Sequence, residues 1–297
     1  MPQLLALLRL MRAHHWVKNV LVLVPLVTSF SLADATRLRA GLVAFIALSL
    51  IASATYIVND LMDLPHDRQH PHKRLRPLAA GQIAAWLALL VALMLLGLGS
   101  VLAWCVNADF FRMMVMYVVL TLSYSRWLKA CALIDVLALV ALWNIRLWGG
   151  ALAIGVSLSV WLLSFGAFVF LSLSLLKRAI ELHAGKHAPL EYLPGRGYRP
   201  ADLPWVQSLG LAAVVAATVV LALFVDSSSA QGHYAEPARL WLLCPAIFYW
   251  LSRLWLKMQR GEMQHDPVAY SLTDGVSWWV GAVVVASVVW AHGVWSW

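Results

Sequence analysis

The chain has 297 residues, of which 62% are hydrophobic and only 12% are charged. A soluble domain of this length needs more polar surface, so the composition excludes a soluble enzyme and predicts a polytopic helical membrane protein. The net charge of +8 does not indicate nucleic-acid binding, because an excess of Lys and Arg on the cytosolic side of a membrane protein explains it.

Apolar runs predict an all-α bundle of about nine transmembrane helices, of which the fourth and fifth are short. No internal repeat, low-complexity stretch or separate soluble domain interrupts these runs, so we expect one membrane domain over residues 1–297. The predicted spans are residues 17–33, 38–60, 82–106, 112–126, 131–148, 157–177, 204–225, 238–257 and 276–295.

The Lys and Arg residues that lie between the predicted spans or near their ends predict the orientation of the chain. With the N-terminus placed in the cytosol, seventeen of these residues lie on the inner side and four on the outer side. This asymmetry predicts a cytosolic N-terminus and an outer C-terminus, which requires an odd number of spans. We therefore expect a multi-pass protein of a bacterial inner membrane.

The segment between the second and third predicted spans, NDLMDLPHDRQHPHKRLRPLAAG, is rich in acids and bases. Its carboxylates Asp60, Asp63 and Asp67 fall within an arc of roughly 60° on one helix face. Pro65 disturbs that helix, and a loop position for Asp67 is the alternative. Because Mg²⁺ binds through one or two carboxylates plus substrate phosphate, we predict all three as metal ligands, with Asp60 and Asp63 catalytic. The predicted phosphate-binding groups of this segment are Asn59, Lys73, Arg74 and Arg76.

This segment carries a family resemblance. Asn59-Asp60-x-x-Asp63-x-x-x-Asp67, followed by His70-Pro71-x-Lys73-x-x-Arg76-Pro77, resembles the first aspartate-rich motif of the UbiA superfamily of intramembrane prenyltransferases. The resemblance implies an all-helical membrane transferase, usually with nine transmembrane helices. It also implies that Mg²⁺ binds a diphosphate donor in a pocket that opens to the cytosol. The lipid bilayer is then the protein's surroundings and a partner.

The N-terminal stretch HHWVKN, residues 14–19, allows two interpretations. It is either an interfacial anchor or a segment whose Lys18 and Asn19 bind substrate phosphate at the mouth of the cavity. It resembles the W-x-K-N segment of the superfamily branch that includes decaprenyl-phosphate phosphoribosyltransferase.

The fifth predicted span contains two charged residues, Asp135 and Arg146, where a charge is costly without a partner. Eleven residues of helix separate them by about 16 Å, so they cannot pair directly. Each therefore needs a partner on another helix or a wet cavity. As an alternative, Arg146 extends toward the outer interface, since Gly149 and Gly150 follow it.

The sixth predicted span ends in Lys177-Arg178-x-x-Glu181, where other UbiA branches have a second aspartate-rich motif. KR-x-x-E resembles the phosphoribosyltransferase branch, so we predict Lys177 and Arg178 as catalytic, phosphate-binding bases and Glu181 as a further residue of the phosphate-binding site. A positively charged topological anchor is the alternative. Before the last span, Glu262, Asp266 and Asp274 either supply a second acidic set or hold the loop by pairing with Arg260.

Together these features predict a Mg²⁺-dependent transferase with a diphosphate-bearing donor and a polyprenyl lipid substrate. The favoured reaction is phosphoribosyl transfer to a polyprenyl phosphate, and the alternative is transfer of a prenyl group from prenyl diphosphate to an aromatic or other acceptor. A transporter is the alternative of another class, but the acids cluster on one side and no inverted repeat is visible. Neither the lipid chain length nor the oligomeric state follows from the sequence.

Overall fold

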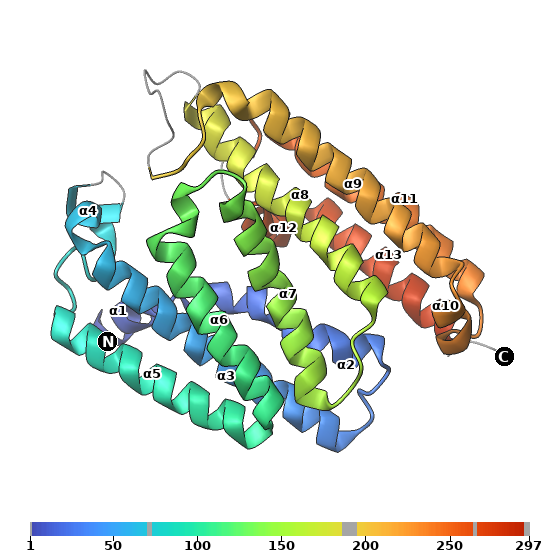
Figure 1. Cartoon of the computed structure of the whole chain (residues 1–297), viewed down its shortest axis with the longest axis horizontal. Coiled ribbons are helices and arrows are strands. Elements are labelled where there is room, and N and C mark those ends of the chain that lie inside the picture. Colours follow the sequence, from blue (N-terminus) through green and yellow to red (C-terminus); the bar gives the residue numbers. More distant parts are fainter. Residues whose placement is uncertain (1, 70–72, 186–194, 264–265, 294–297) are drawn as a thin grey trace. The chain divides into compact units, whose positions relative to one another are not determined.

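The computed structural model describes residues 2–69, 73–185, 195–263 and 266–293, and every regular element of this part of the chain is a helix (Figure 1). The predicted all-α fold class is therefore confirmed. The chain divides into two compact units, of which the first comprises residues 1–128 and 144–158 and the second comprises residues 129–143 and 159–297.

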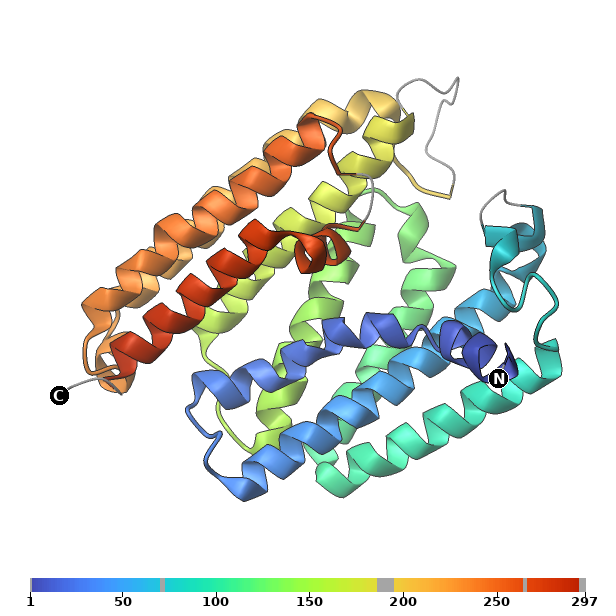
Figure 2. The same ribbon diagram turned by 180° about the vertical axis from the view of Figure 1, so that it is seen from behind.

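The first unit is built on α3 (Ala35–Met62), which lies side by side with α5 (Ala85–Val106) and also packs on α6 (Ala108–Arg126), as Figures 1 and 2 show. Asp34 begins α3, because its side chain accepts hydrogen bonds from the backbone amides of Thr36 and Arg37. The other elements of this unit are α1 (Pro2–Leu10), η1 (Ala13–Leu23), α2 (Val24–Thr28), α4 (Leu64–Gln69) and η2 (Lys73–Leu75).

The second unit is built on α8 (Val160–Gly185), which packs along α9 (Leu203–Val225) and α11 (Leu243–Gln259). The buried Trp255 of α11 donates a 2.9 Å hydrogen bond to Ser172 of α8. Helix α7 (Ile134–Ile154) contributes its residues up to 143 to this unit and the rest to the first unit. The shorter elements and the last helix are η4 (Pro200–Asp202), α10 (Ser228–His233), η5 (Pro237–Leu242), α12 (Pro267–Thr273) and α13 (Gly275–His292), with η3 (Leu128–Ala130) before α7.

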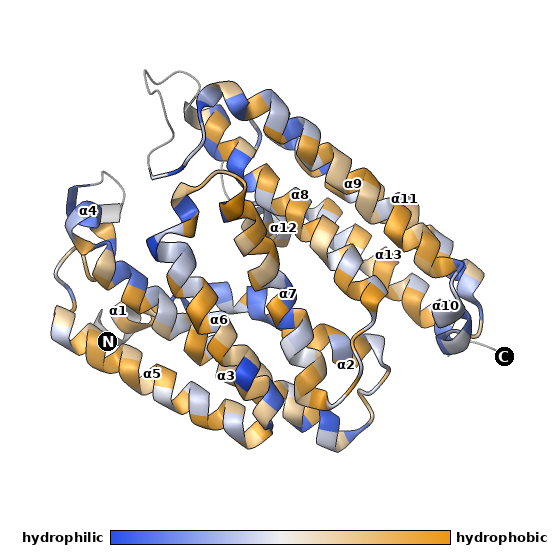
Figure 3. Cartoon of the chain, viewed as in Figure 1, coloured by the Kyte–Doolittle hydropathy of each residue, from blue (hydrophilic) through white to orange (hydrophobic). Residues whose placement is uncertain are grey.

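Six of the described helices are long and apolar enough to cross a membrane, and apolar residues dominate them in Figure 3. Large apolar side chains such as Trp86, Leu93 and Met94 are exposed on α5. Exposed apolar surface of this extent is typical of a helix surrounded by lipid. The chain is therefore a multi-pass membrane protein. The six spans are Ala35–Met62, Ala85–Val106, Ile134–Ile154, Val160–Ala184, Pro200–Val225 and Gly275–His292.

Three of the nine predicted spans are not among these six helices, so the predicted number is not confirmed. The span predicted over residues 17–33 is wrong as a single helix, because the 3₁₀ helix η1 leads into α2, which ends at Thr28. The span predicted over 112–126 lies within α6, which carries charged Asp109 and Arg112 near its start. The span predicted over 238–257 is divided between η5 and the 17-residue α11.

Gly150 lies where α7 meets η1 without room for a side chain. A methyl group at this buried position would overlap the backbone carbonyl oxygen of Val22. We expect Gly150→Ala to destabilise the protein by about 1–3 kcal/mol, the usual cost of overpacking. Thermal unfolding in detergent measures this effect.

Gly97 of α5 provides the matched control for this prediction. A methyl group there meets no atom within 4 Å. Because alanine favours a helix over glycine by about 1 kcal/mol, Gly97→Ala should leave the unfolding midpoint unchanged or raise it. Equal midpoints for the two variants would contradict the close approach of α7 and η1.

Candidate active site

The three motif carboxylates do not share one helix. Asp60 lies in the last turn of α3, Asp63 caps the end of that helix, and Asp67 lies on the separate helix α4. Helix α3 cannot continue through Pro65, because this residue has no amide hydrogen to donate to the preceding turn. In α4 the proline lies in the first turn, where no such hydrogen bond is needed. The prediction that all three carboxylates share one helix face is therefore wrong. The alternative, a loop position for Asp67, is also wrong, because Asp67 lies in the short helix α4.

Two arginines hold the buried carboxylates Asp60 and Asp67, which are only 4% and 2% exposed. The Nη1 atom of Arg76 lies 3.1 Å from Oδ1 of Asp60 and 2.6 Å from Oδ2 of Asp67. The Nη2 atom of Arg12 lies 2.6 Å from the same oxygen of Asp60. These short contacts are charge-assisted hydrogen bonds, and they offset the cost of burying two negative charges.

The predicted three-carboxylate metal set is not assembled in the described part of the chain, where no three acidic, His or Cys side chains are gathered for a metal ion. Asp63 instead accepts a 3.2 Å hydrogen bond from the amide of Asn59. Asp60 and Asp67 do converge, since both contact Arg76. Two carboxylates and a substrate phosphate form a suitable donor set for Mg²⁺, so the residues fit this ion.

The predicted bases beyond α4 lie in different settings. Arg76 joins the carboxylates, whereas Arg74 is exposed on η2, the element in which Lys73 also lies. Residues 70–72, which include His70 and Pro71 of the motif, lie outside the described residues.

Asn19 is buried at the contact of η1 with α3, whereas its neighbour Lys18 is partly exposed. The Asn19 amide donates a 3.1 Å hydrogen bond to Ser49, and its carbonyl oxygen accepts one from Nε of Arg146. Asn19 thus helps to hold η1 in place. Phosphate binding by Lys18 and Asn19 stays a prediction. Lys18 is the more accessible of the two to a substrate, because it is partly exposed and Asn19 is buried.

Arg146 is also buried, at 6% exposure. Besides Asn19, it contacts Tyr117 of α6, with Nη2 lying 3.2 Å from the hydroxyl group. The alternative in which Arg146 extends to the outer interface is therefore wrong. The expectation that this charge requires partners on other elements is confirmed, because η1 and α6 supply them.

In the second unit, Arg178 and Asp135 are both fully buried, and their Nη2 and Oδ2 atoms lie 2.7 Å apart. Arg178 also pairs with Glu181 one turn along α8. The next base, Lys177, is 39% exposed and lies 3.4 Å from Asp266. Buried charges require such compensation, so the second predicted motif has a structural function in addition to any substrate contact.

Tyr198 extends this charged network and was not found by sequence reasoning. Its hydroxyl donates a 2.8 Å hydrogen bond to Asp135 and accepts one from the amide of Leu133. Burial, together with the bond to Asp135, raises the pKa of Tyr198, so the hydroxyl keeps the proton it donates. The adjacent Gly197 is required by this fold, since a Cβ there would lie 2.6 Å from the carbonyl oxygen of Ala130, but no pattern in the sequence indicates the contact of Tyr198 with Asp135.

The three later acids each contact a base. Glu262 pairs with Lys257, and Asp266 caps α12 as well as contacting Lys177. Asp274 caps α13 and makes two contacts of 2.7 and 2.9 Å with Arg253, which hold the pKa of that carboxyl down at about 2. The structure therefore supports the loop-holding alternative, but the pairing bases are Lys257, Lys177 and Arg253 in place of the predicted Arg260.

A family model described as the UbiA prenyltransferase family matches residues 22–273. The chain belongs to this family. The sequence-based resemblance is thereby confirmed, and with it the assignment to a family of membrane transferases.

Several curated relatives cover most of this UbiA-family chain. A nodulation protein, NoeC of Azorhizobium caulinodans, is 36% identical over 90% of this chain and 86% of its own length. The decaprenyl-phosphate phosphoribosyltransferase of Mycobacterium tuberculosis is 37% identical over 69% of each chain. The uncharacterized protein y4nM of Sinorhizobium fredii is 38% identical over 95% of this chain, which spans only 55% of that relative.

Solved structures show the same fold. A UbiA homolog from Archaeoglobus fulgidus bound to GPP and Mg²⁺ aligns with a TM-score of 0.69 and 17% identity, covering 98% of this chain and 100% of the other. A digeranylgeranylglyceryl phosphate synthase aligns with a TM-score of 0.67 and 16% identity, over 98% of this chain and 99% of the other. The predicted UbiA-like architecture is confirmed.

Proposed function

We propose that this UbiA-family chain transfers a phosphoribosyl group from phosphoribosyl diphosphate to a polyprenyl phosphate. The main support is the likeness to decaprenyl-phosphate phosphoribosyltransferase, at 37% identity over 69% of the chain. The Lys177–Arg178 pair, in place of a second aspartate-rich motif, supports the same choice. Asp60, Asp63 and Asp67 remain the proposed metal ligands, with the basic residues of both motifs as phosphate contacts.

In the proposed reaction, a phosphate oxygen of the lipid bonds to the anomeric carbon of the ribose. The bond from that carbon to the diphosphate breaks, and the diphosphate leaves with the electron pair. Bound Mg²⁺ offsets the charge that develops on the leaving group. Arg76 contacts Asp60 and Asp67, and in this proposal it holds diphosphate oxygens beside these carboxylates.

Transfer of a prenyl group from prenyl diphosphate is the second candidate. It is favoured by the structural likeness to the Archaeoglobus fulgidus homolog bound to GPP and Mg²⁺. That donor has no phosphate beyond its diphosphate, so it offers no partner for a second cluster of bases.

A labelling experiment separates the two candidates. Purified protein in lipid nanodiscs is incubated with Mg²⁺, polyprenyl phosphate and phosphoribosyl diphosphate labelled in the ribose, or with labelled prenyl diphosphate and lipid extract. Ribose label in the organic phase, abolished by a chelator, supports the proposal. A new product from prenyl label alone establishes the second candidate, and no transfer from either donor contradicts both.

We further propose a bacterial inner-membrane location, with the N-terminus and the active site on the cytosolic side. The excess of Lys and Arg in the inner segments supports this orientation. A reporter fused after Trp297 should report a periplasmic location, and one inserted next to Gly195 a cytosolic one. A cytosolic signal at the C-terminus would contradict the predicted odd number of spans.

A further inference from the structure

Arg12 contacts the first motif from the N-terminal segment, 48 residues away from Asp60 in the sequence. We propose that Arg12 is a positioning residue that competes with the divalent cation for Asp60 and turns to the donor's diphosphate when the cation binds. This inference rests on the proposed use of Mg²⁺ and a diphosphate donor, whichever of the two donors is correct.

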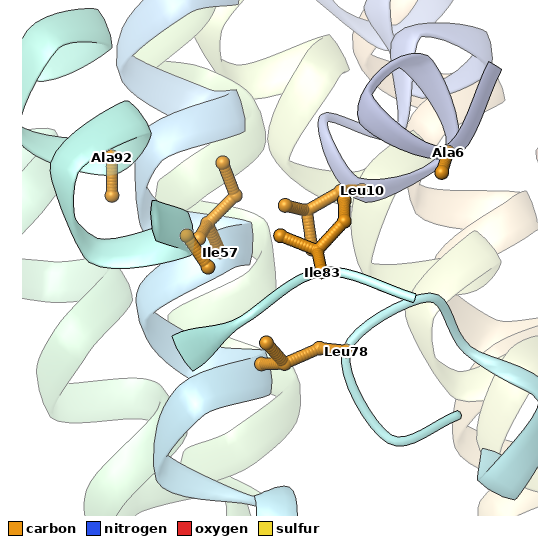
Figure 4. Packing of buried hydrophobic residues seen from close by; sticks show 7 residues of the cluster. Ala6, Leu10, Ile57, Leu78, Ile83 and Ala92 are labelled. Carbon is orange, nitrogen blue, oxygen red and sulfur yellow. The ribbon is translucent and has the colours of Figure 1, made fainter. Parts of the chain in front are cut away.

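The fold places Arg12 firmly at this position. Leu10 and Ala6 of α1 are buried against Ile57 of α3 and Ile83, as Figure 4 shows. After α1 the chain turns sharply, because Arg12 has left-handed backbone angles (φ 51°, ψ 45°), which are uncommon for a residue with a side chain.

Hydrogen bonds on both sides of Arg12 secure this turn. Ser53 of α3 donates a 2.9 Å hydrogen bond to the carbonyl oxygen of Met11 and accepts a 3.0 Å bond from the indole of Trp16. The guanidinium also lies 5.2 Å from the ring centre of Tyr56, at a distance suited to a cation–π contact. The backbone is therefore held on both sides of Arg12, and a change of partner requires movement of the long side chain alone.

The charges explain why Arg12 and a cation exclude one another. Arg12 and Arg76 converge on the same Oδ1 atom of Asp60, which is only 4% exposed. A divalent cation that binds this oxygen must displace at least one guanidinium, since positive charges repel strongly at such distances. Arg76 also has a 2.6 Å contact with Asp67, so Arg12 is the group that moves away from Asp60. The displaced group then needs a new anion, and a diphosphate held by the same cation supplies one.

Competition of this kind makes the binding of the cation depend on the diphosphate. Without diphosphate, the cation must break the Arg12–Asp60 ion pair and leave the guanidinium without an acceptor. With diphosphate, the same displacement creates a new ion pair. The cation and the diphosphate should therefore strengthen each other's binding, and this coupling should depend on Arg12.

The test measures binding and requires no turnover. The affinity of detergent-purified protein for Mn²⁺, a spectroscopic substitute for Mg²⁺, is measured by electron paramagnetic resonance with and without inorganic pyrophosphate. We expect Arg12→Met to bind Mn²⁺ about tenfold more tightly than wild type without pyrophosphate, which corresponds to about 1.4 kcal/mol. With pyrophosphate this advantage should disappear, and the variant should bind pyrophosphate more weakly.

Arg9→Met is the matched control, because Arg9 carries the same charge on the exposed side of the same N-terminal segment. It should leave both affinities unchanged. Folding of Arg12→Met is expected, since Asp60 keeps Arg76; Arg12→Gln serves the same test if that variant does not fold.

Unchanged or weaker Mn²⁺ binding by the folded Arg12 variant without pyrophosphate overturns the proposal. A shift of the same size in Arg9→Met also overturns it, because net charge then explains the effect. Failure of the donor assay, in contrast, concerns only the proposed reaction. If wild type binds no Mn²⁺ even with pyrophosphate, the metal assignment itself fails.

Discussion

Arg178→Ala is expected to destabilise the protein by about 3–5 kcal/mol, the usual cost of leaving one member of a buried ion pair alone. The guanidinium of Arg178 and the carboxylate of Asp135 are both fully buried. Without Arg178, the carboxylate of Asp135 keeps its hydrogen bond from the Tyr198 hydroxyl but loses the positive charge that compensates its own. The unfolding midpoint in detergent and the yield of folded protein should both fall.

Lys177→Ala tests the same prediction at the adjacent position. Lys177 is 39% exposed, and its contact with Asp266 is an open ion pair. Such pairs contribute about 0–1 kcal/mol, so this variant should remain close to wild type. Equal unfolding midpoints for the two variants would show that the buried ion pair stabilises the protein no more than the exposed one does.

The double variant Asp135→Asn/Arg178→Met removes both charges and should recover most of the lost stability. It also separates folding from substrate binding. If Arg178 additionally holds a donor phosphate, the folded double variant should show a raised KM for phosphoribosyl diphosphate. The loss expected is about 1.5–3 kcal/mol, with the KM for the lipid unchanged. Wild-type kinetics would leave Arg178 with a structural role alone, and the phosphoribosyl proposal would lose one of its supports.

Asp60→Asn is expected to lower the rate of transfer about a hundredfold or more while membrane insertion stays normal. The change keeps the shape of the side chain but removes the charge that Arg12 and Arg76 share. A cation then loses one of its two convergent carboxylates. Initial rates at saturating donor, measured on protein that elutes as wild type, provide the test.

Asp109→Asn is the control for this change, since Asp109 is 60% exposed and pairs with Arg112 at the start of α6. It should retain wild-type activity. If all three carboxylates bind the metal, the transfer rate of Asp63→Asn should fall as that of Asp60→Asn does. Near-full activity of Asp60→Asn would refute the metal assignment.

The sequence predicted those features that depend on neighbouring residues. Apolar runs gave the helical membrane fold, and the spacing of Asp60, Asp63 and Asp67 with Arg76 gave the first motif. The intramembrane Asp135 and Arg146 were recognised as charges that need partners, because an unpaired charge in a membrane is costly regardless of the fold.

The partners themselves were not predictable, because they come from distant parts of the chain. Arg12 lies 48 residues from Asp60, and Tyr198 lies 63 residues from Asp135. Helical periodicity shows which side chains share a face, but not which segment packs against that face. The division of the predicted first span into η1 and α2 was missed for the same reason, since Asn19 and Trp16 are held by Ser49 and Ser53 of α3.

The contact between Asn19 and Arg146 has a consequence for biosynthesis. These residues are 127 positions apart, so the ribosome must add all of the intervening chain before the bond can form. At about 5–20 residues per second, that takes roughly 6–25 seconds. During this interval the N-terminal segment has been made, but residues 144–158 of its unit have not. Until α7 is made, Ser49 and Ser53 can already bind Asn19 and Trp16, but the side-chain oxygen of Asn19 lacks Arg146 and needs a hydrogen bond from interfacial water or the insertion machinery.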